Sequence, residues 1–286
     1  MVVAIQAVNA VVVGFGKVSM MDRTGKDNAP RPSDSYVQSF ARGLQAIRSF
    51  SGQAPSQTLS EVAAATGMTR AGARRILLTL QALGYVRSDG KYFELTPRIL
   101  DLGFAYLSSM PIWNLAQPVM DALVEQVRES CSIAVLDGQD VVYVMRVHTH
   151  KIMSTNLGIG SRLPACWTSL GRVLLAALPQ DQLSSVLAER PRQAFTRHTL
   201  QDDEALRGAI ATVRQQGWCL LNQELEEGLI SIAAPIRDGR GATVAALNLS
   251  GQANRTNPEV MREQMLPHVL KAADEVSRLV AMQPRR

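Results

Sequence analysis

The sequence predicts an α+β protein of two domains, in which a small winged helix-turn-helix precedes a larger domain built on an antiparallel sheet. The segment from Thr58 to Gly84 has the pattern of a helix, a tight turn and a second helix that carries several arginines. Beyond residue 112, helical and strand-like segments lack the regular alternation of a parallel sheet. A chain of 286 residues is long enough for both domains.

The first helix of the pair carries signals at both ends. Thr58 and Glu61 have the S/T-x-x-E spacing in which each side chain binds the other's free backbone N–H. Gly67 can adopt the left-handed conformation that ends a helix. We therefore expect a short helix that begins at Thr58 and ends at Gly67, where the turn starts.

The second helix combines a core face with a basic face. Its apolar residues repeat at three- and four-residue intervals: Ala73, Ile76, Leu77, Leu80 and Leu83. Thr69 is a suitable N-cap, and Arg70, Arg74 and Arg75 are left on the surface. In helix-turn-helix proteins the N-terminal residues of the second helix lie at the base edges. Thr69, Arg70, Ala71 and Arg74 are therefore predicted to read DNA.

A two-stranded wing is predicted after the helices. Residues 85–87 and 92–95 are strand-like and flank a turn at 88–91. Arg87 and Lys91 would lie near the tip and contact phosphates, which position a protein without reading sequence. The alternatives are a helical hairpin without a DNA role and a basic hairpin that is merely solvated. The succession of helix, turn, helix and wing favours DNA binding.

Positive charge is concentrated in the same region. Residues 35–98 hold eight Lys or Arg against three Asp or Glu, whereas residues 99–286 hold eighteen against nineteen. Such an excess attracts a polyanion. Arg42, in the helix expected before the pair, completes the predicted DNA-binding set.

The DNA-binding domain is predicted to span residues 35–95. Its first helix has a stripe that we expect to face the core, formed by Val37, Phe40, Leu44, Ile47 and Phe50. Residues 1–34 begin apolar and continue polar, so we expect a disordered or non-native extension. Translation starting at Met20 or Met21 is our hypothesis for this extension.

A linker helix is predicted over residues 96–111. Thr96-Pro97 is a helix start, and Ile99, Leu102 and Tyr106 follow at helical spacing. The apolar side of this helix either pairs two subunits or packs on the chain's own C-terminal domain. The pattern does not distinguish the two.

The C-terminal domain is predicted to span residues 112–286. It opens with a helix to about Val127, and its other expected helices are at 170–178, at 204–216 and after Asn257-Pro258. Strands are expected at 131–136, 141–147, 218–223, 230–236 and 243–249. The loop at 149–167 is long, so we expect it either to have a function of its own or to contain a further strand. This order favours an antiparallel-rich sheet flanked by helices over a doubly wound parallel sheet.

Cysteine usage and hydropathy limit the cellular setting. Cys131, Cys166 and Cys219 have neither a disulfide pattern nor metal-site spacing, which is typical of a reducing cytoplasm. No uninterrupted apolar segment has membrane length, so no membrane partner is expected.

Further segments share a common pattern: YVQSFARGL at 36–44, LTPR at 95–98, ESCS at 129–132, LDG at 136–138, RLPA at 162–165, TSLGRVLLA at 168–176, QELEEGL at 223–229 and AALNLS at 245–250. With the helix-turn-helix, they resemble the IclR family of bacterial regulators, and within it the protocatechuate and 4-hydroxybenzoate branch. The resemblance covers residues 35–280.

This resemblance implies a winged helix-turn-helix joined by a linker helix to a GAF-like effector-binding domain, in a dimer or a dimer of dimers. It implies binding to palindromic promoter sites and control of genes for aromatic-compound breakdown. The setting would be a bacterial cytoplasm, with the protein on the nucleoid when bound to DNA. The expected effector is a small carboxylic acid such as protocatechuate, 4-hydroxybenzoate or β-ketoadipate, and no cofactor is expected.

The resemblance places the effector pocket on one face of the sheet, where several residues match it. Thr168 and Ser169 open a helix whose free N–H groups suit a carboxylate. Ser231 lies on one strand, and Asn248 and Ser250 share a face of another. The structural alternative is that these polar groups bond to one another or to neighbouring backbone.

Three larger side chains are secondary candidates for the pocket. Trp167 either supplies an aromatic wall or fills the core. Arg146 and Arg162 either bind a carboxylate bidentately or pair with surface acids.

No metal or catalytic site is predicted. His148 and His150 share a strand face but lack a nearby third ligand. The acidic residues at 224, 226 and 227 have no paired site or nucleophile. The predicted function is a ligand-responsive DNA-binding transcriptional regulator. The alternatives are a small-molecule enzyme fused to a basic winged module and a constitutive DNA-binding protein with a vestigial pocket.

Overall fold

The computed structural model describes residues 36–109, 112–149, 157–190 and 193–282. The chain divides into two compact units between Ala105 and Tyr106. The predicted extension at residues 1–34 lies outside the described residues, as does His150.

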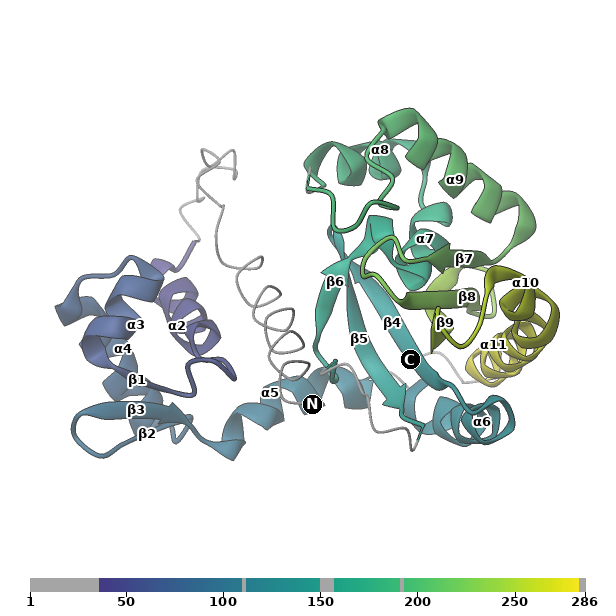
Figure 1. The fold of residues 1–286 in the computed structure, drawn as a ribbon. Coiled ribbons are helices and arrows are strands. Elements are labelled where there is room, and N and C mark those ends of the chain that lie inside the picture. Colours follow the sequence, from purple (N-terminus) through teal and green to yellow (C-terminus); the bar gives the residue numbers. More distant parts are fainter. Residues whose placement is uncertain (1–35, 110–111, 150–156, 191–192, 283–286) are drawn as a thin grey trace, which may run out of the picture. The chain divides into compact units, whose positions relative to one another are not determined.

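Within its described residues, the first unit packs three helices with a small antiparallel sheet whose strand order is β1-β3-β2 (Figure 1). Its helices are α2 (Gln38–Ser49), α3 (Leu59–Thr66) and α4 (Arg70–Ala82). Its strands are β1 (Ser56–Thr58), β2 (Val86–Ser88) and β3 (Tyr92–Leu95). The predicted helix-turn-helix and the predicted wing are confirmed. Strand β1 was not predicted, because its three residues, SQT, carry no strand pattern and depend on pairing with β3.

The helix ends follow the predicted capping chemistry. The Glu61 carboxylate accepts the Thr58 backbone N–H at 2.7 Å, and Thr58 Oγ1 accepts the Glu61 N–H at 3.3 Å. Gly67 has a φ of 65°, in the left-handed region. Thr69 Oγ1 caps α4 by accepting the Gly72 N–H at 3.1 Å. Local sequence alone therefore sets the turn between the two helices.

The predicted core stripe of α2 is wrong in its N-terminal half. Val37, Phe40 and Leu44 are 62%, 68% and 43% exposed, whereas Phe50 is buried and Ile47 is partly buried against the core. Only the C-terminal turns of α2 pack into the helix-turn-helix core. An apolar stripe predicts a face that will be covered, but it does not say by which molecule.

The predicted linker begins as a short 3₁₀ segment, Pro97–Ile99, and continues as α5 (Leu100–Ser109). None of the α5 residues is buried. The large apolar side chains that it exposes are Leu100, Leu102, Phe104 and Tyr106.

The second unit is built on a six-stranded sheet whose order is β6-β5-β4-β9-β8-β7, with every pair antiparallel. The strands are β4 (Ser130–Asp137), β5 (Asp140–Val147), β6 (Arg162–Pro164), β7 (Cys219–Asn222), β8 (Leu229–Arg237) and β9 (Thr243–Gln252). The predicted antiparallel sheet is confirmed, and β6 is the further strand of the long loop.

Helices cover both faces of this sheet (Figure 1). One apolar core lies under α7 (Ser169–Ala176), α8 (Gln180–Glu189) and α9 (Asp203–Gln216), and the other lies under α6 (Ile112–Val127) and α11 (Leu266–Ala281). Helix α8 was not predicted. The C-terminal helix begins as α10 (Pro258–Val260) and reaches α11 through a π-helical turn, Met261–Met265.

Candidate DNA-binding surface and effector site

Helix α4 buries one side and presents cations on the other. Ala73, Leu77 and Leu80 enter the core, because they recur at helical spacing. The residues predicted to contact DNA at its start, Thr69, Arg70, Ala71, Arg74 and Arg75, are all exposed. Among the described residues, no acid forms an ion pair with these arginines, so their charges face solvent.

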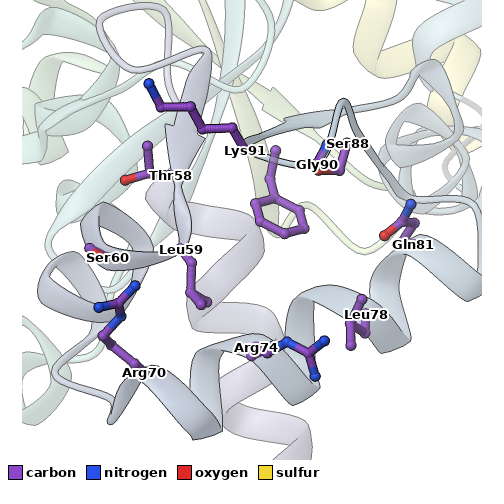
Figure 2. A pocket seen from close by; sticks show the side chains of 11 residues that line it. Thr58, Leu59, Ser60, Arg70, Arg74, Leu78, Gln81, Ser88, Gly90 and Lys91 are labelled. Carbon is purple, nitrogen blue, oxygen red and sulfur yellow. The ribbon is translucent and has the colours of Figure 1, made fainter.

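A hollow of about 550 Å³ lies between α4 and the wing (Figure 2). Its lining combines three cations with hydroxyl and apolar groups: Thr58, Leu59, Ser60, Arg70, Arg74, Leu78, Gln81, Ser88, Gly90, Lys91 and Phe93. Sequence reasoning missed Ser60, Leu78, Gln81 and Ser88, because none is basic. The spacing of Arg74, Leu78 and Gln81, which places them on one edge of α4, was the available signal.

The wing is less basic than its composition suggests. Arg87 pairs with Glu94 across the hairpin, with Nη2 and Oε2 2.6 Å apart. Asp89 closes the turn by accepting the N–H groups of Lys91 and Tyr92. The Lys91 ammonium lies 5.0 Å from the centre of the Tyr92 ring. Lys91 is thus the wing cation that lines the hollow, whereas Arg87 already has a partner on the hairpin.

Arg42 is exposed on α2 and does not line the hollow. It stands apart from the Arg70, Arg74 and Lys91 cluster in the lining, so its predicted role in DNA binding stays a prediction.

In the second unit, the strands place polar residues on the sheet face beneath α7. Leu247 and Leu249 of β9 enter the core under α6 and α11, so Asn248 between them faces the other side. The β4 register pairs Asn248 with Ser132 and Ser132 with Arg146 of β5. Residues directly opposite in a ladder project to the same face. Arg146, Ser132 and Asn248 therefore form a row across three strands.

A second polar row lies beside the first. Ser250 pairs with Ser130 on one side and with Ser231 on the other. We call these two rows the polar strip: Ser130, Ser132, Arg146, Ser231, Asn248 and Ser250. The structure thus brings together four predicted effector residues. It adds Ser130 and Ser132, which sequence reasoning missed because their place in the strip depends on strand register.

Near this face, the buried side-chain oxygens of Asn248 and Ser169 have no hydrogen-bond partner among the described residues. Asn248 is 3% exposed, and its Nδ2 donates to Ser250 Oγ at 3.0 Å. Its Oδ1 finds no hydrogen-bond partner among the described residues. Ser169, at the start of α7, is 1% exposed, and its Oγ likewise finds none there. A buried polar atom without a partner is unfavourable, so it is a place where a ligand can bind.

The start of α7 is held rigidly. A Cβ at Gly171 would lie 2.1 Å from the backbone oxygen of Ala165, so only glycine fits there. Arg172 is buried and donates to Cys166 O at 2.9 Å. It also makes a two-pronged ion pair with Glu224, with distances of 3.0 and 2.5 Å. These contacts fix the helix start that carries Thr168 and Ser169.

The secondary candidates lie in different surroundings. Trp167 is buried, donates Nε1–H to Leu200 O at 2.9 Å and packs against Phe195, so it fills the core. Arg162 forms ion pairs with Asp137 and Asp140 at 2.7 and 3.1 Å, at the hairpin between β4 and β5. Arg146 lies in the polar strip and donates to Leu157 O at 2.9 Å.

Within the described residues, no three His, Cys, Asp or Glu side chains come together as a metal site. In the same part of the chain, every helix is too short or too polar to span a membrane.

Two family models match the chain. The IclR helix-turn-helix domain matches residues 39–90, and the bacterial transcriptional regulator IclR C-terminal domain matches residues 104–278.

Individual proteins agree with these matches. The Pca regulon regulatory protein of Pseudomonas putida is 41% identical over 242 residues, which are 84% of this chain and 83% of that protein. A solved transcriptional regulator from Rhodococcus sp. RHA1 superposes with a TM-score of 0.78 at 48% identity, covering 86% of this chain and 99% of that one. A double mutant of the PobR inducer-binding domain from Acinetobacter, solved with 3-hydroxybenzoic acid, has a TM-score of 0.56 at 34% identity. It covers 58% of this chain and 98% of that domain.

Proposed function

Because this chain belongs to the IclR family of bacterial transcriptional regulators, we propose that it controls transcription in response to a hydroxylated aromatic acid held on the polar strip. The protein is a DNA-binding regulator of the type that governs aromatic-compound catabolism, and not an enzyme. We place its action in the bacterial cytoplasm, where it meets the chromosome.

The observation that carries the effector proposal is the unpartnered amide oxygen of Asn248 in a buried polar row. Asn248 and Arg146 occupy the two ends of that row, with Ser132 between them. A guanidinium favours a carboxylate, and an amide oxygen favours a donor such as a hydroxyl. If the Asn248 amide is rotated by half a turn, its oxygen accepts from Ser250 and its NH2 group is left for the ligand.

The dimensions of the row suit a single aromatic ring. Strands in a sheet are about 4.8 Å apart, so the backbones of Arg146 and Asn248, two strands apart, are separated by about 10 Å. A single aromatic ring with a carboxylate at Arg146 and a hydroxyl at Asn248 fits within this distance. An aromatic acid with a ring hydroxyl therefore fits better than a plain benzoate, and the Acinetobacter domain solved with 3-hydroxybenzoic acid supports this class.

Other predicted residues enter the proposal with supporting roles. The Ser169 hydroxyl and the N–H groups at the start of α7 offer further donors beside the sheet face. Ser231 and Ser250 extend the strip. Trp167 fills the core, and Arg162 stays with its two aspartates.

The experiment is calorimetric titration of the full chain with 4-hydroxybenzoate, benzoate and a β-ketoadipate-type dicarboxylate. We expect 4-hydroxybenzoate to bind most tightly. Asn248→Leu should lower its affinity about tenfold to a hundredfold, because a hydrogen bond to a buried group is lost, and leave benzoate unchanged. Arg146→Gln should weaken all three acids.

Arg162→Gln is the matched control, since it removes the same side-chain type from outside the strip. Equal binding of benzoate and 4-hydroxybenzoate would contradict the role proposed for Asn248 but not the rest of the effector proposal. No binding of any acid by the wild-type chain would contradict the effector proposal as a whole.

We propose a second copy of this chain as the partner for the exposed apolar faces of α2 and α5. Both faces carry large apolar side chains that the described residues leave mostly exposed: Val37, directly before α2, Phe40 on α2, and Leu100 and Phe104 on α5. Two-fold pairing matches a palindromic operator. Sedimentation of Phe40→Glu and Phe104→Glu variants should show loss of the dimer, whereas unchanged dimerisation in both would contradict this proposal.

A further inference from the structure

The hollow between α4 and the wing has a composition that suits a nucleic-acid backbone (Figure 2). Arg70 and Arg74 supply cations from the helix side and Lys91 supplies one from the wing side, and no carboxylate is among the lining residues. Ser60 and Ser88 add hydroxyl groups that can donate to phosphate oxygens. The hollow therefore presents positive charge and hydrogen-bond donors from opposite walls.

Two carboxylates, those of Glu61 and Asp89, lie close to Lys91, but both accept hydrogen bonds from backbone N–H groups. The Glu61 carboxylate accepts from the backbone N–H and the hydroxyl of Thr58, at 2.7 and 2.8 Å. Asp89 accepts from the backbone N–H groups of Lys91 and Tyr92, at 2.9 and 2.7 Å. Backbone hydrogen bonds lower the pKa of both carboxyls, which fixes them as capping anions. Neither side chain lines the hollow, so an incoming anion meets the three cations.

Helix α4 has two exposed edges, and only one faces the hollow. Arg70, Arg74, Leu78 and Gln81, spaced by four, four and three residues, line it. Ala71, Arg75 and Thr79 are also exposed, but they lie on the neighbouring edge and are absent from the lining. The helix can therefore touch two different parts of a duplex at once.

The apolar part of the lining distinguishes a sugar–phosphate chain from a free anion. Leu59, Leu78 and Phe93 line the same hollow as the cations, and Leu78 is 41% exposed. Deoxyribose offers carbon surface for such side chains, whereas inorganic phosphate offers none. The combination of charge and apolar surface matches the phosphates and sugars along one DNA strand.

We propose that this hollow seats the sugar–phosphate backbone of one DNA strand, with Arg70 and Arg74 holding it from α4 and Lys91 holding it from the wing. The outer edge of α4, with Ala71 and Arg75, then reads the bases. Arg70 and Arg74 thereby change role, from the base contacts expected from sequence to phosphate contacts. The inference rests on the proposed DNA-binding function and divides its residues between two tasks.

The test compares two duplexes by fluorescence anisotropy over a range of salt concentrations. One duplex is selected from a randomised pool with the full wild-type chain, and the other has random sequence. Arg70→Gln, Arg74→Gln and Lys91→Gln should each lower affinity by the same factor on both duplexes. Each should also reduce the slope of log affinity against log salt by about 0.9, the value for one lost phosphate contact.

Arg75→Gln is the matched control, because it removes the same charge from the outer edge. It should lower affinity for the selected duplex more than for the random one. The altered side chains are exposed, so unchanged melting temperatures will show that the variants fold.

The proposal is overturned if Arg74→Gln weakens only the selected duplex with an unchanged salt slope, or if Lys91→Gln changes neither affinity nor slope. It is also overturned if the variants lose binding of inorganic phosphate but keep full DNA affinity. Failure of the wild-type chain to bind any duplex would instead refute the DNA-binding function itself.

Discussion

The two units keep their functional side chains in opposite ways. In the first unit the candidate residues are exposed arginines and a lysine whose charges face solvent, as at Arg70 and Arg74. In the second unit they are small polar groups buried in a sheet face, as at Ser132 and Asn248. DNA arrives as a large polyanion that cations must reach from the surface. A small acid must be taken out of water, so its partners lie inside the fold.

This contrast extends to the ion pairs. Arg87 and Glu94 on the wing have side chains 75% and 38% exposed, whereas those of Arg172 and Glu224 in the second unit are only 4% and 12% exposed. Solvent screens the first pair, and the second holds two elements together in a medium of low polarity. Substitutions should therefore change stability far more in the second unit than in the first.

The largest expected effect is that of Gly171→Ala. The added Cβ would meet the Ala165 backbone at 2.1 Å, and neither chain segment can yield without moving the start of α7. We expect a loss of more than about 4 kcal/mol in the free energy of unfolding, in the range of severe core disruption.

Thiol labelling measures this loss, because Cys131, Cys166 and Cys219 all lie in the second unit and burial raises the pKa of each thiol. Native thiols should therefore react slowly. Gly208→Ala is the control, since its added Cβ meets nothing within 4 Å and alanine favours the helix. Equal labelling rates in the Gly171 and Gly208 variants would contradict the close-packing argument.

The next effect compares Arg172→Met with Arg87→Met. Removing Arg172 leaves Glu224 buried without its cation, which costs about 3–5 kcal/mol. Removing Arg87 should cost at most about 1 kcal/mol, because its pair is solvated. Urea unfolding of both variants measures the difference. Similar losses in the free energy of unfolding would contradict the contrast between the two units.

A smaller effect than that of Arg172→Met is expected for Thr58→Ala in the first unit. It removes the side-chain half of the capping box at α3 and should cost about 1 kcal/mol. Melting followed by circular dichroism measures the change. Thr79→Ala is the control, because that hydroxyl only bonds to the Arg75 carbonyl within its own helix. A Thr79 variant as destabilised as the Thr58 variant would argue against a specific capping role.

The first unit was predictable from sequence because its signals are local. Thr58, Glu61, Gly67 and Thr69 act within a few residues of one another, so their spacing reports their contacts. The covering of an apolar face is not local, and the stripe through Val37 and Phe40 was therefore assigned to the wrong partner.

The effector site depends on contacts that sequence order hides. Ser130 and Ser132 join the polar strip only through the register of β4 with β9. The pairing of Arg162 with Asp137 and Asp140 likewise joins residues more than twenty positions apart. Alternation along β9 was sufficient to pair Asn248 with Ser250, but it could not show which strands lie beside them.

The π-helical turn at Met261–Met265 bears on how this chain tolerates changes in length. A π turn is a place where a helix accommodates one extra residue. In an α-helix, one inserted residue would rotate everything after it by about 100°, a single step of the 3.6-residue turn. Widening the turn absorbs that step, so Val269, Ala272 and Val276 still face the sheet. Deleting one residue between 262 and 264 should therefore leave the residues after the turn facing as before, which makes this turn a natural position for single-residue length variation.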